Sequence, residues 1–174
     1  MDIVRIGDKL IDREKIIDTV NAVLNLRLQG FSQQEIANRL NIDRTLISRL
    51  ESIGEVRRGG RVALVGFPVG NVKEIEELLK EEGVEFYLLM TEKERLKFIS
   101  EKSGQQIVND TMDIIAKVKN YDIIFVIGSN YRIKLCQALF DKEIIGIEIG
   151  KSPIKRDVYV DPEELREMIR LVRQ

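Results

Sequence analysis

Apolar residues recur every three or four positions between residues 13 and 28, and this period predicts an amphipathic helix. Asp12 is its expected N-cap and Gly30 its expected stop. The apolar stripe consists of Ile16, Ile17, Val20, Val23, Leu24 and Leu28. Before this helix, two short apolar segments at residues 3–6 and 9–11 flank Gly7-Asp8 and predict a small hairpin.

Two shorter helices are predicted next. Ser32-Gln-Gln-Glu35 has the form of a capping box, and the helix that it opens would turn Ile36, Ala37 and Leu40 inward. After a turn at Asn41, Asp43 is placed to cap a third helix over residues 44–53. The residues expected on its inner side are Leu46, Ile47 and Leu50.

From residue 61 onward, apolar runs alternate with amphipathic stretches. Runs at 61–65, 84–90, 122–128 and 143–150 predict strands, and residues 157–160 predict a fifth short strand. Helices are expected at 72–82, from 91 onward, and at 105–120, 131–140 and 162–172; Asn71 is the expected cap of the first. Strands apolar on both faces, each followed by a helix, indicate a parallel sheet covered on both sides.

The predicted fold class is therefore α/β: an N-terminal all-α helix-turn-helix domain followed by a small doubly wound, Rossmann-like or flavodoxin-like, parallel-sheet domain. The expected boundaries are residues 1–53 for the helical DNA-binding domain and 61–174 for the α/β domain. Residues 54–60 form a basic, glycine-rich linker between them.

The segment around the second and third helices carries a functional signal. Ala37 is small enough for two helices to cross closely, and Asn41 is among the few non-glycine residues that accept a left-handed turn. The stretch GFSQQEIANRLNIDRTLISRLE resembles the lambda-repressor-like, Xre-type helix-turn-helix family, over residues 12–53. The family often has Gly where this chain has Asn41. The resemblance implies that the third helix reads the major groove of double-stranded DNA and that Gln33 contacts phosphate.

The outer face of the third helix is rich in hydrogen-bond donors. Removal of the inward positions leaves Arg44, Thr45, Ser48 and Arg49 together, and such side chains read base edges and phosphates. In the linker, Arg57 and Arg58 are expected to contact phosphates; alternatively Gly59-Gly60 turns a wing whose arginines reach the minor groove. The competing interpretation of the helical domain is a protein-binding module with a merely solvated arginine face.

Composition narrows the chemistry. The absence of His excludes an imidazole base and a His-ligated metal, and a single Cys excludes both a zinc site and an internal disulfide. The net charge of −1 divides into +2 for residues 1–61 and −3 for residues 62–174. The part of the chain that includes the expected DNA-binding domain is therefore mildly basic. The charged N-terminus and the lack of a long apolar run lead us to expect a cytoplasmic protein with no membrane partner.

The strand ends of the α/β domain are the expected place for a ligand. Helix N-termini that follow such ends offer free amides to an anion, so a small anionic effector is a candidate partner, and no cofactor is expected. The residues concerned are Gly66, Gly70, Asn71, Gly128, Ser129 and Asn130. The alternative is that these glycines only make tight turns. RVALVG is faintly similar to the NAD-binding domain of redox-sensing repressors, but Phe67-Pro-Val replaces the glycine-rich loop.

These observations predict a sequence-specific DNA-binding transcriptional regulator and not an enzyme. A homodimer is expected, with the α/β domain mediating dimerisation, because two helix-turn-helix units double the DNA site. Two alternatives stay open. One is a nucleotide- or phosphosugar-handling α/β enzyme with a helical appendage, for which the candidate groups are Asp110, Asp113, Ser129 and Lys151. The other is an adaptor that uses both domains for protein contacts.

Overall fold

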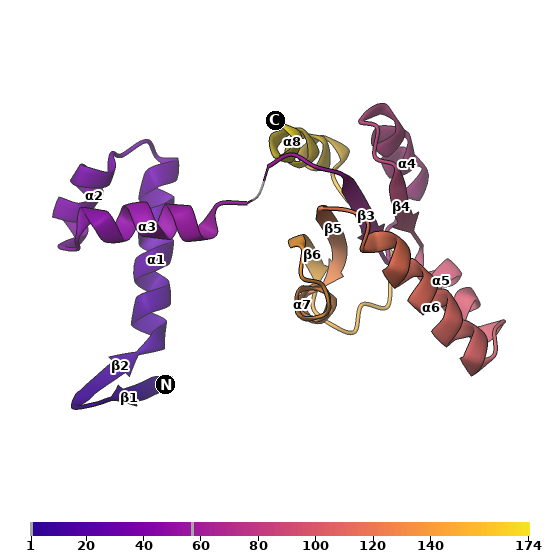
Figure 1. Ribbon diagram of the computed structural model, residues 1–174, viewed down its shortest axis with the longest axis horizontal. Coiled ribbons are helices and arrows are strands. Elements are labelled where there is room, and N and C mark those ends of the chain that lie inside the picture. The colour runs from indigo at the N-terminus through magenta and orange to yellow at the C-terminus, as the bar shows by residue number, and fades with distance from the viewer. Residues whose placement is uncertain (1, 57) are drawn as a thin grey trace. The chain divides into compact units, whose positions relative to one another are not determined.

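The computed structural model describes residues 2–56 and 58–174, which form two compact units (Figure 1). The N-terminal unit extends to Glu55, and the α/β unit begins at Val56. Within residues 2–56 and 58–174 no helix is long and apolar enough to cross a membrane.

The N-terminal unit opens with the predicted hairpin. Strand β1 (Ile3–Ile6) pairs antiparallel with β2 (Lys9–Asp12), and Gly7 turns between them with a positive φ of 59°. Asp12 then caps helix α1 (Arg13–Leu28), since its Oδ1 accepts hydrogen bonds from the backbone N–H groups of Glu14 and Lys15. Hairpin, cap and helix are confirmed as predicted.

Helices α2 (Gln33–Leu40) and α3 (Arg44–Gly54) complete this unit beside α1 (Figure 1). Their small core consists of Val23, Ile36, Ala37 and Ile47, with Leu26, Phe31, Leu40 and Ile42 packed around it. Asp43 caps α3 as predicted, but Leu46 was wrongly placed inside: its side chain is 45% exposed. The inner side of α3 is taken by Ile47 and the half-buried Leu50, one helical turn apart, and Leu46 projects beside that line.

The apolar stripe of α1 is only partly covered. Val23 is fully buried and Leu26 packs against the same core, whereas Ile17, Leu24 and Leu28 lie on another side of the helix and are exposed. Because Ile17, Leu24 and Leu28 are spaced by seven and four residues, they form one continuous face. We call these three residues the exposed face of α1. Among residues 2–55, nothing buries it.

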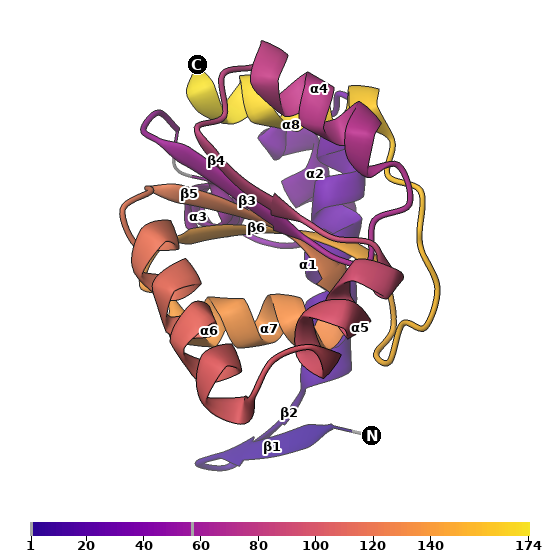
Figure 2. The same ribbon diagram turned by 90° about the vertical axis from the view of Figure 1, so that its right-hand side faces the viewer.

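The α/β unit contains a four-stranded parallel sheet in the order β4-β3-β5-β6. Its strands are β3 (Val62–Gly66), β4 (Phe86–Leu89), β5 (Ile123–Ser129) and β6 (Glu143–Gly150). Its helices are α4 (Val72–Glu81), α5 (Glu92–Ser100), α6 (Gly104–Val118), α7 (Asn130–Leu139) and α8 (Pro162–Arg173). Helices α4 and α8 cover one face, and α5, α6 and α7 lie on the other (Figure 2). The predicted α/β class and parallel sheet are confirmed.

One predicted strand is wrong. In residues 157–160 only Val158 makes a bridge, and its partner is Val69 in the loop that follows β3. The segment therefore passes the carboxyl end of the sheet instead of extending one of its edges. It is held there by Gly70, whose N–H donates to the Val158 carbonyl oxygen at 2.8 Å.

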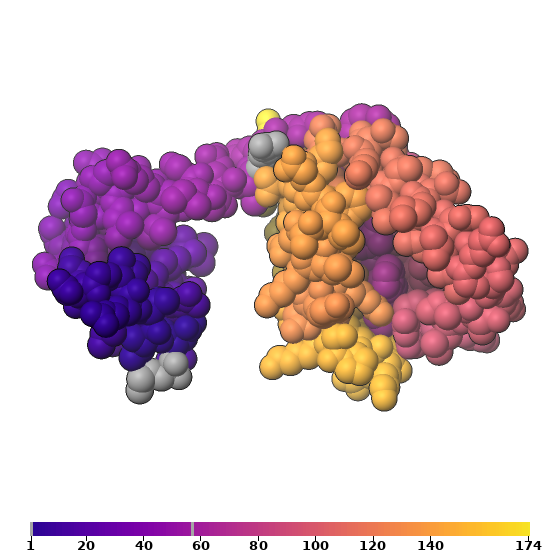
Figure 3. Space-filling view, turned by 60° about the horizontal axis from the view of Figure 1, so that its bottom comes forward, coloured from indigo at the N-terminus to yellow at the C-terminus, as the bar shows by residue number. Residues whose placement is uncertain are grey.

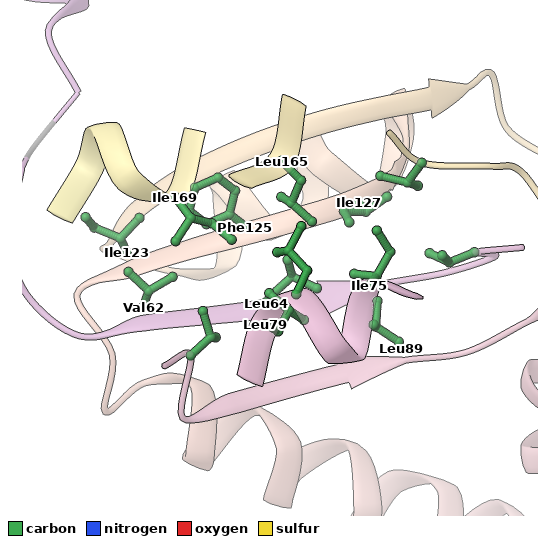
Figure 4. Close-up of a cluster of buried hydrophobic side chains, with 14 of the residues drawn as sticks. Val62, Leu64, Ile75, Leu79, Leu89, Ile123, Phe125, Ile127, Leu165 and Ile169 are labelled. Atoms are coloured by element: carbon green, nitrogen blue, oxygen red, sulfur yellow. The ribbon is translucent and has the colours of Figure 1, made fainter. Parts of the chain in front are cut away.

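The two faces of the sheet differ in packing. Under α4 and α8 lies the larger core, in which Leu64, Phe125 and Ile169 are fully buried (Figure 4). The end of α4 is tied to α8 by Glu82, which accepts hydrogen bonds from Arg166 and Arg170 at 2.8 and 2.7 Å. On the opposite face, α5 has no buried residue and α6 only Val118. Helices α5 and α6 therefore pack less tightly on the sheet than α4 and α8 do.

Candidate nucleic-acid interface

The turn between α2 and α3 is set by one residue. Asn41 adopts the left-handed conformation (φ 52°, ψ 48°), and the N–H of Ile42 donates to the Ala37 carbonyl oxygen at 3.1 Å. Asn tolerates this conformation better than other residues with a Cβ, because its short polar side chain can bond locally. The predicted left-handed turn is confirmed, and it directs α3 away from α2 after only three residues.

The outer side of α3 presents four polar side chains in one line. Thr45, Ser48, Arg49 and Ser52 are exposed and follow the i, i+3, i+4, i+7 spacing of a single helix face. Arg44 is exposed one turn before Ser48. The ion pairs among residues 2–56 and 58–174 include neither Arg44 nor Arg49, so both guanidinium groups have their donors available. An α-helix with its side chains is about 10–12 Å across and so fits a major groove about 12 Å wide, and the eleven residues of α3 extend for about 16 Å.

The N-terminal end of α3 is already occupied by a carboxylate. Asp43 Oδ1 accepts a hydrogen bond from the Thr45 backbone N–H at 2.6 Å, and this bond lowers the pKa of Asp43. An ionised Asp43 repels phosphate. The available donors of this helix are therefore its side chains and not its terminal amides.

A polar network joins all three helices behind that face. Glu51 of α3 accepts from Arg27 Nε of α1 at 2.6 Å and from Gln33 Nε2 of α2 at 2.9 Å. Arg27 also donates to the Phe31 carbonyl oxygen at 2.6 Å. The hydrogen bonds from Arg27 and then Gln33 lower the pKa of Glu51, which keeps it ionised at neutral pH.

The network fixes the position of Gln33, the residue expected at a phosphate. Its side chain is half-buried, and one amide hydrogen already points to Glu51. The other hydrogen and the Gln33 backbone N–H in the first turn of α2 are the groups that a phosphate would meet. Arg27 and Glu51 were not found from the sequence, because a pair 24 residues apart leaves no periodic signal.

The connection between the units is partly described. Arg57 lies outside the described residues, and Arg58 is exposed. The Gly59 N–H donates to the Val172 carbonyl oxygen at 2.6 Å, so the chain is already attached to α8 at this point. Residues 61–65 do not form a wing, since β3 lies between β4 and β5 inside the parallel sheet.

Gly66 and Asn71, two of the candidate ligand residues, have structural roles at the loop after β3. A Cβ added to Gly66 would lie 2.9 Å from Leu89 Cδ2 and 3.1 Å from Ile127 Cβ, so neighbouring side chains explain this glycine. Asn71 was expected to cap α4, but its side chain makes no capping hydrogen bond. Instead, its amide pairs with Val160, accepting from the N–H at 3.0 Å and donating to the carbonyl oxygen at 2.8 Å.

The second group lies at the adjacent end of β5. Ser129 is buried and its Oγ caps α7 by accepting from the Arg132 N–H at 3.4 Å. Asn130 Oδ1 accepts from the Ser152 N–H at 3.2 Å and so holds the segment after β6. Gly128 lies close to the loop after β3: a Cβ added to it would be 3.6 Å from the Phe67 carbonyl oxygen. The two groups therefore meet at the carboxyl ends of the two central strands, β3 and β5, with most of their polar side-chain atoms bonded internally.

The candidates for an enzyme are dispersed. Asp110 is paired with Lys102 at 2.6 Å, Ser129 is engaged in capping, and Asp113 and Lys151 are exposed on α6 and on the segment after β6. In the described part of the chain, no hydrogen bond or ion pair joins any two of these four residues.

Compared with models of known protein families, with curated proteins and with solved structures, the chain shows no match. Function is therefore inferred from its own residues and geometry.

Proposed function

We propose that this protein is a sequence-specific DNA-binding transcriptional regulator of the lambda-repressor-like, helix-turn-helix type. Its helix α3 enters the major groove, and the protein acts as a homodimer. The observation that carries the proposal is the exposed line of Thr45, Ser48 and Arg49 on a helix whose opposite side is anchored by the buried Ile47. A reading helix needs both a donor-rich outer face and a rigid inner face.

The contacts divide into two classes. Arg49 and Arg44 are the candidates for bidentate hydrogen bonds to guanine, and Thr45 and Ser48 bond to neighbouring base edges or phosphates. Gln33 contacts phosphate from α2, where Glu51 holds its side chain, and Arg57 and Arg58 contact phosphates from the connection between the units. Base contacts give the sequence preference, and phosphate contacts give the register on the duplex.

Dimerisation is supported by apolar side chains that lack partners within their unit. The exposed face of α1 presents Ile17 at 58%, Leu24 at 44% and Leu28 at 85% exposure. Pairing with a second copy would bury this face and place two α3 helices on one duplex. The α/β unit adds a further contact in the dimer, and it is the part of the chain that would bind a small anionic effector.

The charge balance predicts the kind of binding. A surplus of only +2 in residues 1–61 favours weak attraction to DNA of any sequence. Most of the affinity for the correct site must then come from the few side chains on α3. We therefore expect a steep sequence preference together with weak binding to unrelated DNA.

A binding-site selection tests the proposal. The full chain is incubated with random duplexes, the retained sequences are determined, and the affinity for the selected site and for a scrambled duplex is measured at several salt concentrations. The expected result is a palindromic site that binds at least about a thousandfold more tightly than the scrambled duplex. Retention of no preferred sequence would refute the proposal.

A further inference from the structure

A cavity of about 400 Å³ lies between the sheet and helices α5, α6 and α7. Figure 3 shows the hollow between α7, in orange, and α5 and α6, in salmon, with purple atoms of the sheet visible at its base. Val65, Leu88 and Val126 line it from the strands, and Phe98, Ile115 and Leu135 line it from the three helices. The volume lies within the range of pockets that hold small organic molecules.

The wall of this cavity is almost entirely apolar. Among the residues that the structure describes, Arg95 and Arg132 are the only charged residues that line it, and Thr111 is the only one there with a hydroxyl group. Water in such a cavity finds few hydrogen-bond partners, so an apolar molecule is the favoured occupant. The body of a ligand that fits here is therefore hydrocarbon or aromatic.

The two arginines give the cavity a cationic side. Arg132 lies over the Phe67 ring, with its Cζ atom 4.5 Å from the ring centroid, and its Nη1 donates to the Phe67 carbonyl oxygen at 3.1 Å. Arg95 is neutralised by Glu92 through two hydrogen bonds of 2.8 and 2.7 Å. Arg132 takes part in none of the ion pairs among residues 2–56 and 58–174. The two arginines and Glu92 therefore leave one net positive charge on this side of the cavity.

The surroundings of Arg132 favour an additional anion. Burial lowers the pKa of its guanidinium, the positive charge of Arg95 lowers it further, and the Glu92 carboxylate only partly opposes this effect. A carboxylate at Arg132 would relieve the repulsion between the two guanidinium groups and would accept hydrogen bonds that the Phe67 carbonyl oxygen does not use.

We infer that the cavity under α5, α6 and α7 binds a small organic acid with an apolar body, its carboxylate on Arg132 and its hydrocarbon part against the sheet. Phe67 of the loop after β3 lines this cavity, whereas none of Gly66, Gly70, Asn71, Gly128, Ser129 and Asn130 does. The inference does not depend on DNA binding.

Cys136 offers a direct readout, because it is the only cysteine of the chain and it lines the cavity. Decanoate is the probe, and decanol and decylammonium have the same body with a neutral and a cationic head. The full-length protein is titrated with each by calorimetry, and the rate of Cys136 modification by N-ethylmaleimide is followed in parallel. Decanoate is expected to bind at least about tenfold more tightly than decanol, to exceed decylammonium by more, and to slow the modification.

Two substitutions complete the experiment. Arg132→Gln is expected to weaken decanoate binding at least about tenfold and to leave decanol binding within about twofold, because only the charge-assisted bonds are lost. Lys134→Gln removes an equal charge from the exposed side of α7 and should change neither. The comparison of the three head groups uses the wild-type protein. It therefore tests the inference even if Arg132→Gln does not fold.

Three results would overturn the inference. The first is no binding of decanoate, and the second is equal affinity for decanoate and decylammonium. The third is Cys136 protection that rises with protein concentration and not with decanoate, since this would show that a second copy of the chain covers the cavity.

Discussion

Arg27 Nε and Glu51 Oε1 lie 2.6 Å apart and connect the last turn of α1 to α3. The same carboxylate receives Gln33 from α2, so one side chain holds all three helices of the N-terminal unit. Within residues 2–55, the core of that unit contains only four buried residues. The angle between the helices therefore depends on this polar network as well as on apolar packing.

Glu51→Gln is expected to make the unit less stable at neutral pH. The pKa of Glu51 is lowered in the folded protein from its ordinary value near 4.5, so its contribution is present above that value. As the pH falls through the lowered pKa, the wild-type carboxyl takes up a proton and the contribution is lost. Urea unfolding at pH 7 and pH 3 checks this: the difference between wild type and variant should shrink in acid. A difference that stays constant would show that the ionised Glu51 carboxylate does not stabilise the unit.

Ile47 and Leu46 are adjacent in α3 but are expected to respond very differently to truncation. Ile47 is fully buried, so Ile47→Ala should destabilise the N-terminal unit by about 2–5 kcal/mol. Leu46 is 45% exposed, and Leu46→Ala should cost about 1 kcal/mol or less. Thermal unfolding followed by circular dichroism gives both values. Equal losses would show that α3 is rotated from the orientation described.

Asn41 is expected to discriminate between substitutions by backbone conformation. Asn41→Gly should preserve stability, because glycine enters the left-handed region freely, whereas Asn41→Val should cost about 1–2 kcal/mol. The side chain is exposed, so lost packing cannot produce the difference. Denaturant unfolding measures it. Similar stabilities for Gly and Val would argue against a left-handed residue at this turn.

The exposed face of α1 is expected to hold two copies of the chain together. The double substitution Ile17→Glu with Leu24→Glu places charge on this face and should convert a dimer into a monomer in sedimentation equilibrium. Lys15→Glu changes the charge on the opposite side of α1 and should leave the dimer intact. A monomeric wild-type protein, or a double variant that still dimerises, would remove α1 from the interface.

Local patterns predicted the secondary structure well. The capping box of Ser32 and Glu35, the Asp12 and Asp43 caps and the left-handed Asn41 depend on residues within four positions of each other, and all are present. The parallel sheet was also predictable, because strands that are buried on both faces are apolar throughout. Leu46 was misjudged because helical period alone does not say how wide the covered face is.

Long-range features were beyond the reach of sequence patterns. The pairing of Asn71 with Val160 joins residues 89 positions apart, and it explains why Asn71 does not cap α4. Likewise, Arg132 and Phe67 meet only because β3 and β5 are neighbours in the sheet. The cavity beside them exists because α5 and α6 pack loosely on the sheet. No residue pattern along either helix predicts this loose packing.

Arg49 is the residue that we propose to contact a base, and this contact is measured by equilibrium binding to the selected DNA site and to a scrambled duplex. Fluorescence anisotropy is measured for the wild type, Arg49→Ala and Lys15→Ala, the last removing one positive charge from the N-terminal unit away from α3. Arg49→Ala should lose about 1–3 kcal/mol of discrimination between the two duplexes, and Lys15→Ala should lose none. Equal discrimination by all three proteins would contradict the proposal that α3 is the reading helix.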